Sequence, residues 1–122
     1  MSCSQPVPID IEAAKDIVDG DAELFSELME MFLESAPSSL EGLRQSIEKG
    51  NMPESRRRAH QIKGSLKNFA AIPGIDRAQA VEDAAERGDR DEAETVFREL
   101  ADEIEYLGYY YLKKLWKEHF NE

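Results

Sequence analysis

The segment Ala59-His60-Gln61-Ile62-Lys63-Gly64-Ser65-Leu66-Lys67-Asn68-Phe69-Ala70-Ala71 shows most directly which fold this sequence can adopt. At about 100° of rotation per residue in an α-helix, its apolar side chains gather on one side. They are Ala59, Ile62, Leu66, Phe69 and Ala70. On the same helix, His60 points roughly 140° away from that side. The segment is therefore predicted to be an amphipathic helix that packs its apolar side into a core and exposes His60.

Local signals set the limits of this helix and of its neighbours. Asn51 is a suitable N-cap and Pro73-Gly74 a stop, so the helix that bears His60 is expected over about residues 52–71. Asp21 is also a suitable N-cap, and the apolar spacing after it predicts a helix over 21–35. Pro37 favours a new helix start, which predicts a separate helix over 37–49; the pattern leaves the boundary between these two helices open by several residues. Further helices are predicted over 9–18, 75–87 and 90–117.

The predicted fold class is all-α, because amphipathic helices follow one another through short connections and no stretch alternates as a strand does. We expect an antiparallel up-and-down four-helix bundle with a short extra N-terminal helix. The last helix carries an apolar stripe whose spacing alternates between three and four residues, which suits packing in a left-handed bundle. That stripe is Ala93, Phe97, Leu100, Ile104, Leu107, Tyr111 and Leu115. Residues 1–8 are expected to be a flexible lead-in, and residues 9–122 one domain.

Composition excludes several classes of function. A chain of 122 residues with a net charge of -11 should not bind nucleic acid or an anionic membrane nonspecifically. No apolar run approaches the roughly 20 residues that cross a bilayer, and no signal peptide is evident. The single cysteine, Cys3, cannot form an intramolecular disulfide and fits a reducing compartment. We therefore expect a cytoplasmic protein.

No cofactor or metal is expected in this chain. Its two histidines, His60 and His119, and its one cysteine have no metal-ligand spacing, and no glycine-rich nucleotide loop is present. The aromatic residues near the C-terminus favour packing over cofactor binding. Some of them must be exposed if Tyr111 and Leu115 face the core, which leaves a docking or dimer surface open, although we expect a monomer.

The surroundings of His60 on its helix favour a chemical role for it. Residues three and four positions away are its neighbours on the helix surface, and they include Lys63 and Gly64. A glycine in the middle of a helix costs about 1 kcal/mol relative to alanine, so clearance for a bulky group would explain Gly64. A neutral imidazole can accept a phosphoryl group, and a nearby ammonium stabilises the charge of that group. Residues 55–75 contain no acidic residue and form a basic island in an acidic protein, with Arg56, Arg57, Arg58, Lys63 and Lys67.

The pattern His60-x-x-Lys63-Gly64-Ser65, with Asn68, Phe69 and Ala71 downstream, resembles the histidine-containing phosphotransfer (HPt) domain of two-component phosphorelays. The resemblance covers roughly Pro8 to Leu115, although Leu66 stands where the family often has a small residue and Ala70 where it usually has glycine. It implies a four-helix bundle without catalytic machinery of its own. It also implies two kinds of partner, response-regulator receiver domains and a hybrid histidine kinase, with Mg²⁺ held by the receiver.

The same resemblance implies roles for single residues. His60 would be the phosphoacceptor, Lys63 would stabilise the phosphoryl charge, and Gly64 would keep the site open. Glu82 matches the position of a polar group that orients the histidine, and Gln79 is a weaker candidate for that role. The residues expected to contact a partner are Arg56, Arg57, Gln61 and Lys67.

The sequence therefore predicts a histidine phosphotransfer protein that shuttles a phosphoryl group between receiver aspartates through His60. Taken singly, His60 would be read as a solvated surface histidine, so the interpretation depends on Lys63, Gly64 and the match along the chain. Two alternatives stay open. The chain could be a helical adaptor that binds a signalling partner without phosphotransfer, or the phosphoacceptor module of a larger histidine kinase.

Overall fold

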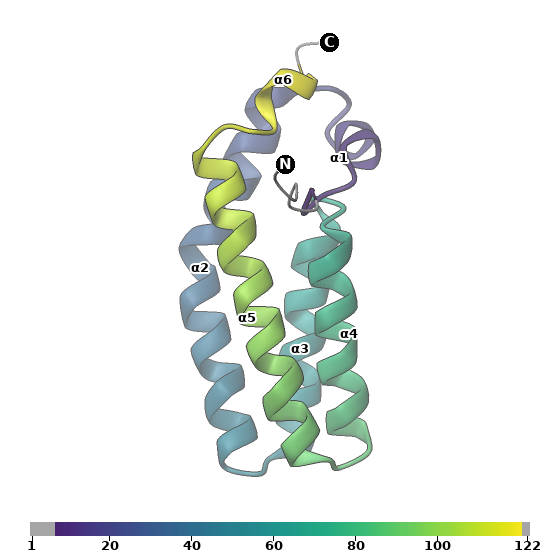
Figure 1. Ribbon diagram of the computed structural model, residues 1–122, viewed down its shortest axis with the longest axis vertical. Coiled ribbons are helices and arrows are strands. Elements are labelled where there is room, and N and C mark those ends of the chain that lie inside the picture. Colours follow the sequence, from purple (N-terminus) through teal and green to yellow (C-terminus); the bar gives the residue numbers. More distant parts are fainter. Residues whose placement is uncertain (1–6, 121–122) are drawn as a thin grey trace, which may run out of the picture.

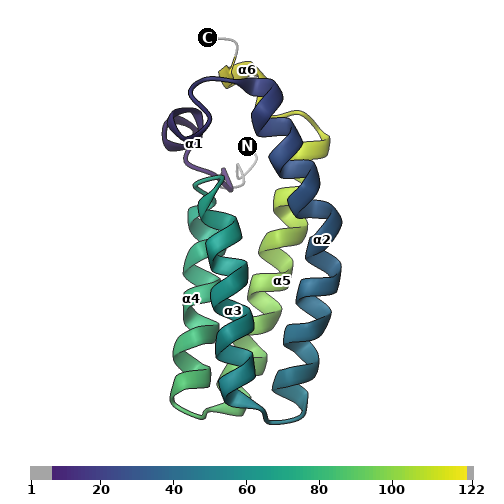
Figure 2. The ribbon, with the colours of Figure 1, turned by 180° about the vertical axis from the view of Figure 1, so that it is seen from behind.

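The computed structural model describes residues 7–120, and every regular element in that range is a helix. The helices are α1 (Ile11–Ile17), α2 (Ala22–Glu48), α3 (Met52–Lys67), α4 (Ile72–Glu86), α5 (Arg90–Leu112) and α6 (Lys117–Phe120). Figures 1 and 2 show the four long helices α2 to α5 side by side as an antiparallel bundle, with α1 and α6 at one end. The predicted all-α four-helix bundle with an extra N-terminal helix is confirmed.

The order of the helices around the bundle decides which faces are free. Helix α3 packs against α2 and α4, and helix α5 packs against the same two helices. Helices α3 and α5 therefore lie on a diagonal: α5 is at the front in Figure 1 and α3 at the front in the reverse view of Figure 2. Their outer faces point in opposite directions.

Side-chain caps start α2 and α3 where the sequence predicted them. The Asp21 carboxylate accepts hydrogen bonds of 3.0 Å from the backbone N–H groups of Glu23 and Leu24 at the start of α2. The Asn51 side chain accepts a bond of 3.2 Å from the N–H of Glu54 at the start of α3. These bonds satisfy N–H groups that have no partner within the first turn of a helix.

An aromatic cluster closes the end of the bundle where α1 and α6 lie. The Phe25 ring is centred 5.0 Å from the Trp116 ring, 4.9 Å from Phe120 and 6.1 Å from Phe69. These rings come from α2, from the turn after α3 and from the C-terminal segment, so they join distant parts of the chain. Trp116 also donates a hydrogen bond of 3.1 Å from its indole Nε1 to the carbonyl oxygen of Tyr111, which fixes the turn between α5 and α6.

The predicted helix boundary at Pro37 is wrong. Helix α2 runs without a break from Ala22 to Glu48, and Pro37 lies inside it. Buried side chains on both sides of the proline, from Phe25 and Met29 to Leu43 and Ile47, belong to one core. Their burial along a single axis outweighs the roughly 3 kcal/mol that proline costs inside a helix.

The predicted stop at Pro73-Gly74 is also wrong, because α3 ends earlier and these two residues begin the next helix. Helix α3 ends at Lys67, and the chain reverses at Ala70, whose φ of 50° is left-handed. Proline fits the first turn of a helix, where its missing N–H would have no partner, so α4 begins at Ile72. A Cβ at Gly74 would lie 3.1 Å from Leu66 Cδ1, so glycine allows the two helices to approach closely there.

The last predicted helix, over 90–117, is shorter in the structure. Helix α5 ends at Leu112, and Lys114 has a left-handed φ of 59°, which turns the chain back over the bundle. Leu115, which the stripe placed in the core, is therefore exposed, while Trp116 and Phe120 are buried in its place.

The expected lead-in and Cys3 lie almost wholly outside the described residues, which begin at Val7. Within them, Pro8 and Ile9 are buried, and the Asp10 N–H donates a hydrogen bond of 2.8 Å to the Ala70 carbonyl. Among residues 7–120, no helix is both long and apolar enough to cross a bilayer.

We expect the substitution Pro37→Ala to raise the free energy of unfolding by about 1–3 kcal/mol. Alanine restores the missing N–H at an exposed position, which outweighs the entropy that the unfolded chain regains. Urea denaturation followed by circular dichroism measures the change. Ser38→Ala, at the neighbouring exposed position, should change stability by no more than about 0.5 kcal/mol. Equal free energies of unfolding for Pro37→Ala and the wild type would show that Pro37 does not destabilise α2.

Candidate functional site

Helix α3 presents His60 midway along the bundle, with its apolar side turned inward. Ala59, Ile62 and Leu66 are buried in the core, and 69% of the His60 side chain is exposed. The exposed position that the helical period predicted for His60 is therefore confirmed. It is held on a packed helix, which fixes a reactive group more precisely than a loop does.

Small side chains on α4 let that helix approach α3 closely beside His60. The side of α4 that carries Ala78, Val81 and Ala85 is buried in the structure. Helix α4 therefore places the Glu82 carboxylate beside the His60 ring. Only 9% of the Glu82 side chain is exposed, which makes its carboxylate a charge largely withdrawn from water.

Two groups from α3 compensate for the Glu82 carboxylate. Its Oε1 lies 3.3 Å from His60 Nδ1, and its Oε2 lies 2.7 Å from the Lys63 ammonium. A buried carboxylate is costly unless it is paired and hydrogen-bonded, so both contacts are required for α4 to place Glu82 there. The sequence predicted Glu82 as the residue that orients His60, and the structure brings the two side chains into contact.

The contact with Glu82 determines which nitrogen of His60 is free. A carboxylate accepts hydrogen bonds but does not donate them, so the contact places a hydrogen on Nδ1. In a neutral imidazole the other nitrogen, Nε2, then carries the lone pair. The arrangement therefore gives a solvent-exposed nucleophilic nitrogen on a ring whose opposite side is anchored.

Lys63 is held more tightly than the sequence indicated. Only 12% of its side chain is exposed. Besides the ion pair with Glu82, its ammonium donates a hydrogen bond of 2.8 Å to Gln79 Oε1. Gln79 in turn donates from Nε2 to Asp83 Oδ1 at 2.9 Å. Gln79, which we considered as an orienting residue for His60, thus contacts Lys63 instead.

Gly64 leaves a vacant place beside His60. A Cβ built on Gly64 meets no other heavy atom within 4 Å, apart from the backbone of its own helix. No contact within the described residues therefore explains why α3 has glycine there, at a cost of about 1 kcal/mol relative to alanine. The vacancy faces solvent on the same surface as His60.

Most of the basic island on α3 is neutralised by acidic side chains. The Arg56 and Glu86 side chains approach to 3.8 Å, and Glu54 pairs with both Arg57 and Arg58. The hydrogen bond from Arg57 lowers the pKa of Glu54 below its usual range. Within residues 7–120, Lys67 is the member of the island that has no ion pair. The island therefore presents less free positive charge than its composition indicates.

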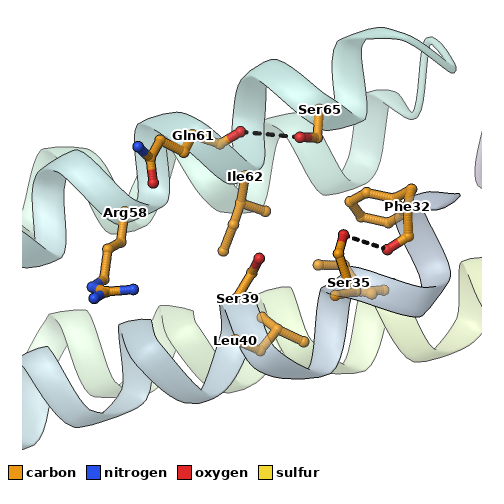
Figure 3. A pocket seen from close by; sticks show the side chains of 10 residues that line it. Phe32, Ser35, Ser39, Leu40, Arg58, Gln61, Ile62 and Ser65 are labelled. Carbon is orange, nitrogen blue, oxygen red and sulfur yellow. Dashed lines mark hydrogen bonds between the residues drawn. The ribbon is translucent and has the colours of Figure 1, made fainter.

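A small pocket lies between α2 and α3, on the side of α3 away from α4. Figure 3 shows Arg58, Gln61 and Ser65 of α3 facing Ser35 and Ser39 of α2 across it. Ile62 and Leu40 form its apolar wall. Gln61, an expected partner-contact residue, is exposed at its edge. No group of three or more potential metal ligands occurs among residues 7–120.

Sequence reasoning missed the partners of the charged residues rather than the residues themselves. Glu54 and Glu86 neutralise arginines of the island, and Asp83 fixes Gln79. The spacing of Glu54 from Arg57 and Arg58, three and four residues, is a local signal that could have revealed the first case. The contacts made by α4 depend on how two helices pack, which no spacing along one helix reveals.

Comparisons with known proteins agree with this geometry. The family model of the Hpt domain matches residues 27–109. In fold, the chain is similar to the crystal structure of histidine-containing phosphotransfer protein B from Pseudomonas aeruginosa, with a TM-score of 0.77 and 18% sequence identity over 96% of this chain and 97% of that chain. A search of curated proteins finds no match. Because the family match spans more than half of the sequence and includes His60, the chain belongs to the Hpt domain family.

Proposed function

We propose that this protein carries a phosphoryl group on His60 Nε2 between the aspartates of receiver domains in a two-component phosphorelay. The observation that carries the proposal is the exposed His60 ring anchored through Nδ1 to the buried Glu82 carboxylate. Membership of the Hpt domain family supports a histidine phosphotransfer role. The vacant place at Gly64 on the same surface supports it independently.

The chemistry is a reversible transfer between two side chains of different proteins. The lone pair of His60 Nε2 attacks the phosphorus of a receiver aspartyl phosphate, so an N–P bond forms while the P–O bond to the aspartate breaks. The aspartate leaves as a carboxylate, and the positive charge that develops on the ring is stabilised by Glu82. The reverse reaction with a second receiver delivers the phosphoryl group. In this proposal the receiver domain supplies the Mg²⁺ that screens phosphoryl charge.

Lys63 supplies positive charge within one helical turn of the phosphorylated nitrogen. Its ammonium is held by Glu82 and Gln79, so it is placed before a partner arrives. A preorganised cation costs little reorganisation when negative charge develops nearby. In the resting protein Glu82 balances that cation, and the added phosphoryl group brings further negative charge to the same cluster.

We further propose that the receiver domain or the hybrid kinase docks on the surface around His60. Arg56, Arg57, Gln61 and Lys67 are all exposed on α3, which supports their assignment as partner contacts. Because Arg56 and Arg57 are paired with acidic residues of this chain, Lys67 offers the least compensated positive charge for an acidic partner surface.

The direct test of the function is the substitution His60→Gln. Incubation of the wild type with a phosphorylated receiver domain should give acid-labile, base-stable label on this chain, and His60→Gln should give none. Circular dichroism should show the same fold for both proteins, because His60 is exposed. Label that survives the substitution would place the phosphoacceptor at a residue other than His60. Wild-type protein that takes no label from any receiver of the same organism would favour the helical adaptor instead.

The substitution Gly64→Ala should separate stability from function. Alanine should raise the free energy of unfolding by about 0.5–1 kcal/mol, because it is the better helix former and its Cβ meets open space. We expect the phosphotransfer rate to fall by about 10-fold or more, as occupation of the vacancy displaces the reacting groups from their aligned positions. The rate is measured by mixing the protein with a phosphorylated receiver and quenching the reaction at set times.

The matched control is Gly108→Ala, inside α5. A Cβ there would lie 3.5 Å from Leu33 Cδ2, an ordinary contact, so the helix should gain similar stability with no change in transfer. Equal transfer rates for Gly64→Ala and Gly108→Ala would show that phosphotransfer does not need the vacant place beside Gly64.

The substitution Glu82→Ala should lower the rate of His60 phosphorylation by about 10- to 100-fold, by analogy with the loss of a group that orients a metal-ligating histidine. Imidazole ¹⁵N chemical shifts should show that the preference for a hydrogen on Nδ1 is lost. Glu82→Gln keeps an oxygen acceptor and should retain part of that preference. Glu86→Ala, one turn further on α4, removes only an exposed ion pair and serves as the control. An unchanged tautomer in Glu82→Ala would show that Glu82 does not orient the ring.

A further inference from the structure

The outer face of α5 carries an exposed apolar patch that the phosphotransfer proposal does not use. We call Tyr106, Tyr109 and Leu112 of α5, together with Leu115 of the turn that follows it, the α5 patch. Leu112 is 74% exposed, Tyr109 53% and Leu115 47%. The Tyr106 and Tyr109 rings stack with their centroids 6.3 Å apart, so they form one surface. An open groove runs beside them and is bordered also by Val7 and Tyr110. Exposed apolar surface of this kind marks an interaction site.

Charged residues flank the α5 patch in a definite order. The exposed acidic residues Asp102 and Glu105 precede Tyr106 on α5. The exposed basic residues Lys113 and Lys114 follow Leu112 in the turn after α5, and Lys117 begins α6. The Lys113 ammonium lies 5.8 Å from the centre of the Tyr109 ring, which places the basic end on the same face. Along the chain, acidic residues therefore come first on this face, apolar residues next and basic residues last.

The charge order is self-complementary: two copies that run in opposite directions place the acidic residues of one against the basic residues of the other. Glu105 lies four residues before Tyr109 (109 minus 105) and Lys113 four residues after it (113 minus 109). At about 1.5 Å per residue, each charge is therefore about 6 Å from Tyr109 along the helix. If two copies of α5 pack antiparallel with Tyr109 at the two-fold axis, Glu105 of each copy lies opposite Lys113 of the other.

We propose that this protein forms a homodimer through the α5 patch, with the two α5 helices antiparallel across Tyr109. A two-fold interface uses the same surface on both copies, and the charge order on α5 meets that requirement. The net charge of -11 on each copy opposes association. The dimer is therefore weak, with a dissociation constant of about micromolar to sub-millimolar, as for other small interfaces.

Dimerisation in this way leaves the phosphotransfer site free. Helices α3 and α5 lie on a diagonal of the bundle (Figures 1 and 2). Because His60 is exposed on α3, the two copies of His60 lie on opposite sides of the dimer, away from the α5 patch. The proposal goes beyond the phosphotransfer function and does not depend on it.

Sedimentation velocity on the full chain, from micromolar to millimolar concentration, tests for the dimer. The wild type should pass from monomer to dimer in this range, and Tyr109→Glu should stay monomeric throughout. Tyr109→Glu should keep the wild-type rate of phosphotransfer, which shows that the variant folds. A wild type that sediments as a monomer at millimolar concentration overturns the proposal.

Charge reversal tests the antiparallel pairing. Glu105→Lys and Lys113→Glu should each weaken dimerisation by roughly 5- to 10-fold, because each places like charges opposite one another twice per dimer. The double variant should regain wild-type affinity. Within one chain these residues are about 12 Å apart along the axis, so the rescue must act between copies. Glu12→Lys, an exposed change of equal net charge on α1, controls for overall repulsion. Failure of the double variant to rescue overturns the antiparallel arrangement.

Discussion

The buried carboxylate of Glu82 is the constraint on which the site depends. A charge so far withdrawn from water must be paired, and α3 supplies both partners, the Lys63 ammonium and the Nδ1 hydrogen of His60. One electrostatic requirement therefore fixes the orientation of the ring, the position of the cation and the identity of the free nitrogen. It can be met only because small side chains on α4 allow that helix to approach α3 closely.

Much of this fold could be predicted from the sequence, because the signals are periodic and local. The three- and four-residue spacing of apolar side chains gave the helices, and cap residues such as Asp21 and Asn51 gave their starts. The errors fell where a tertiary effect outweighs a local signal. Pro37 should interrupt a helix, but a continuous core on both sides keeps α2 helical through it. The end of α5 was missed because Lys114, a residue with no turn propensity, adopts the left-handed conformation there.

The site was predictable to a similar extent. The exposure of His60 follows from the helical period, and the structure places Glu82 beside it as the family resemblance implied. The close hold on Lys63 was not predictable, since Gln79 and Asp83 act from another helix. The same reason explains why a run of basic residues overstated the local positive charge. The sequence shows that Arg56 is basic, but only the packing of α4 shows that Glu86 lies against it.

Helices α1 and α6, the first and last of the described chain, lie toward the same end of the bundle, where the Phe25 and Phe120 rings tie α6 to α2 (Figure 1). Helix α3 lies further down, away from this junction (Figure 2), and His60 is midway along it. A neighbouring module attached at this end of the bundle leaves the imidazole uncovered. The place where a neighbouring module is attached and the surface that a diffusing partner reaches therefore lie at different positions on the bundle.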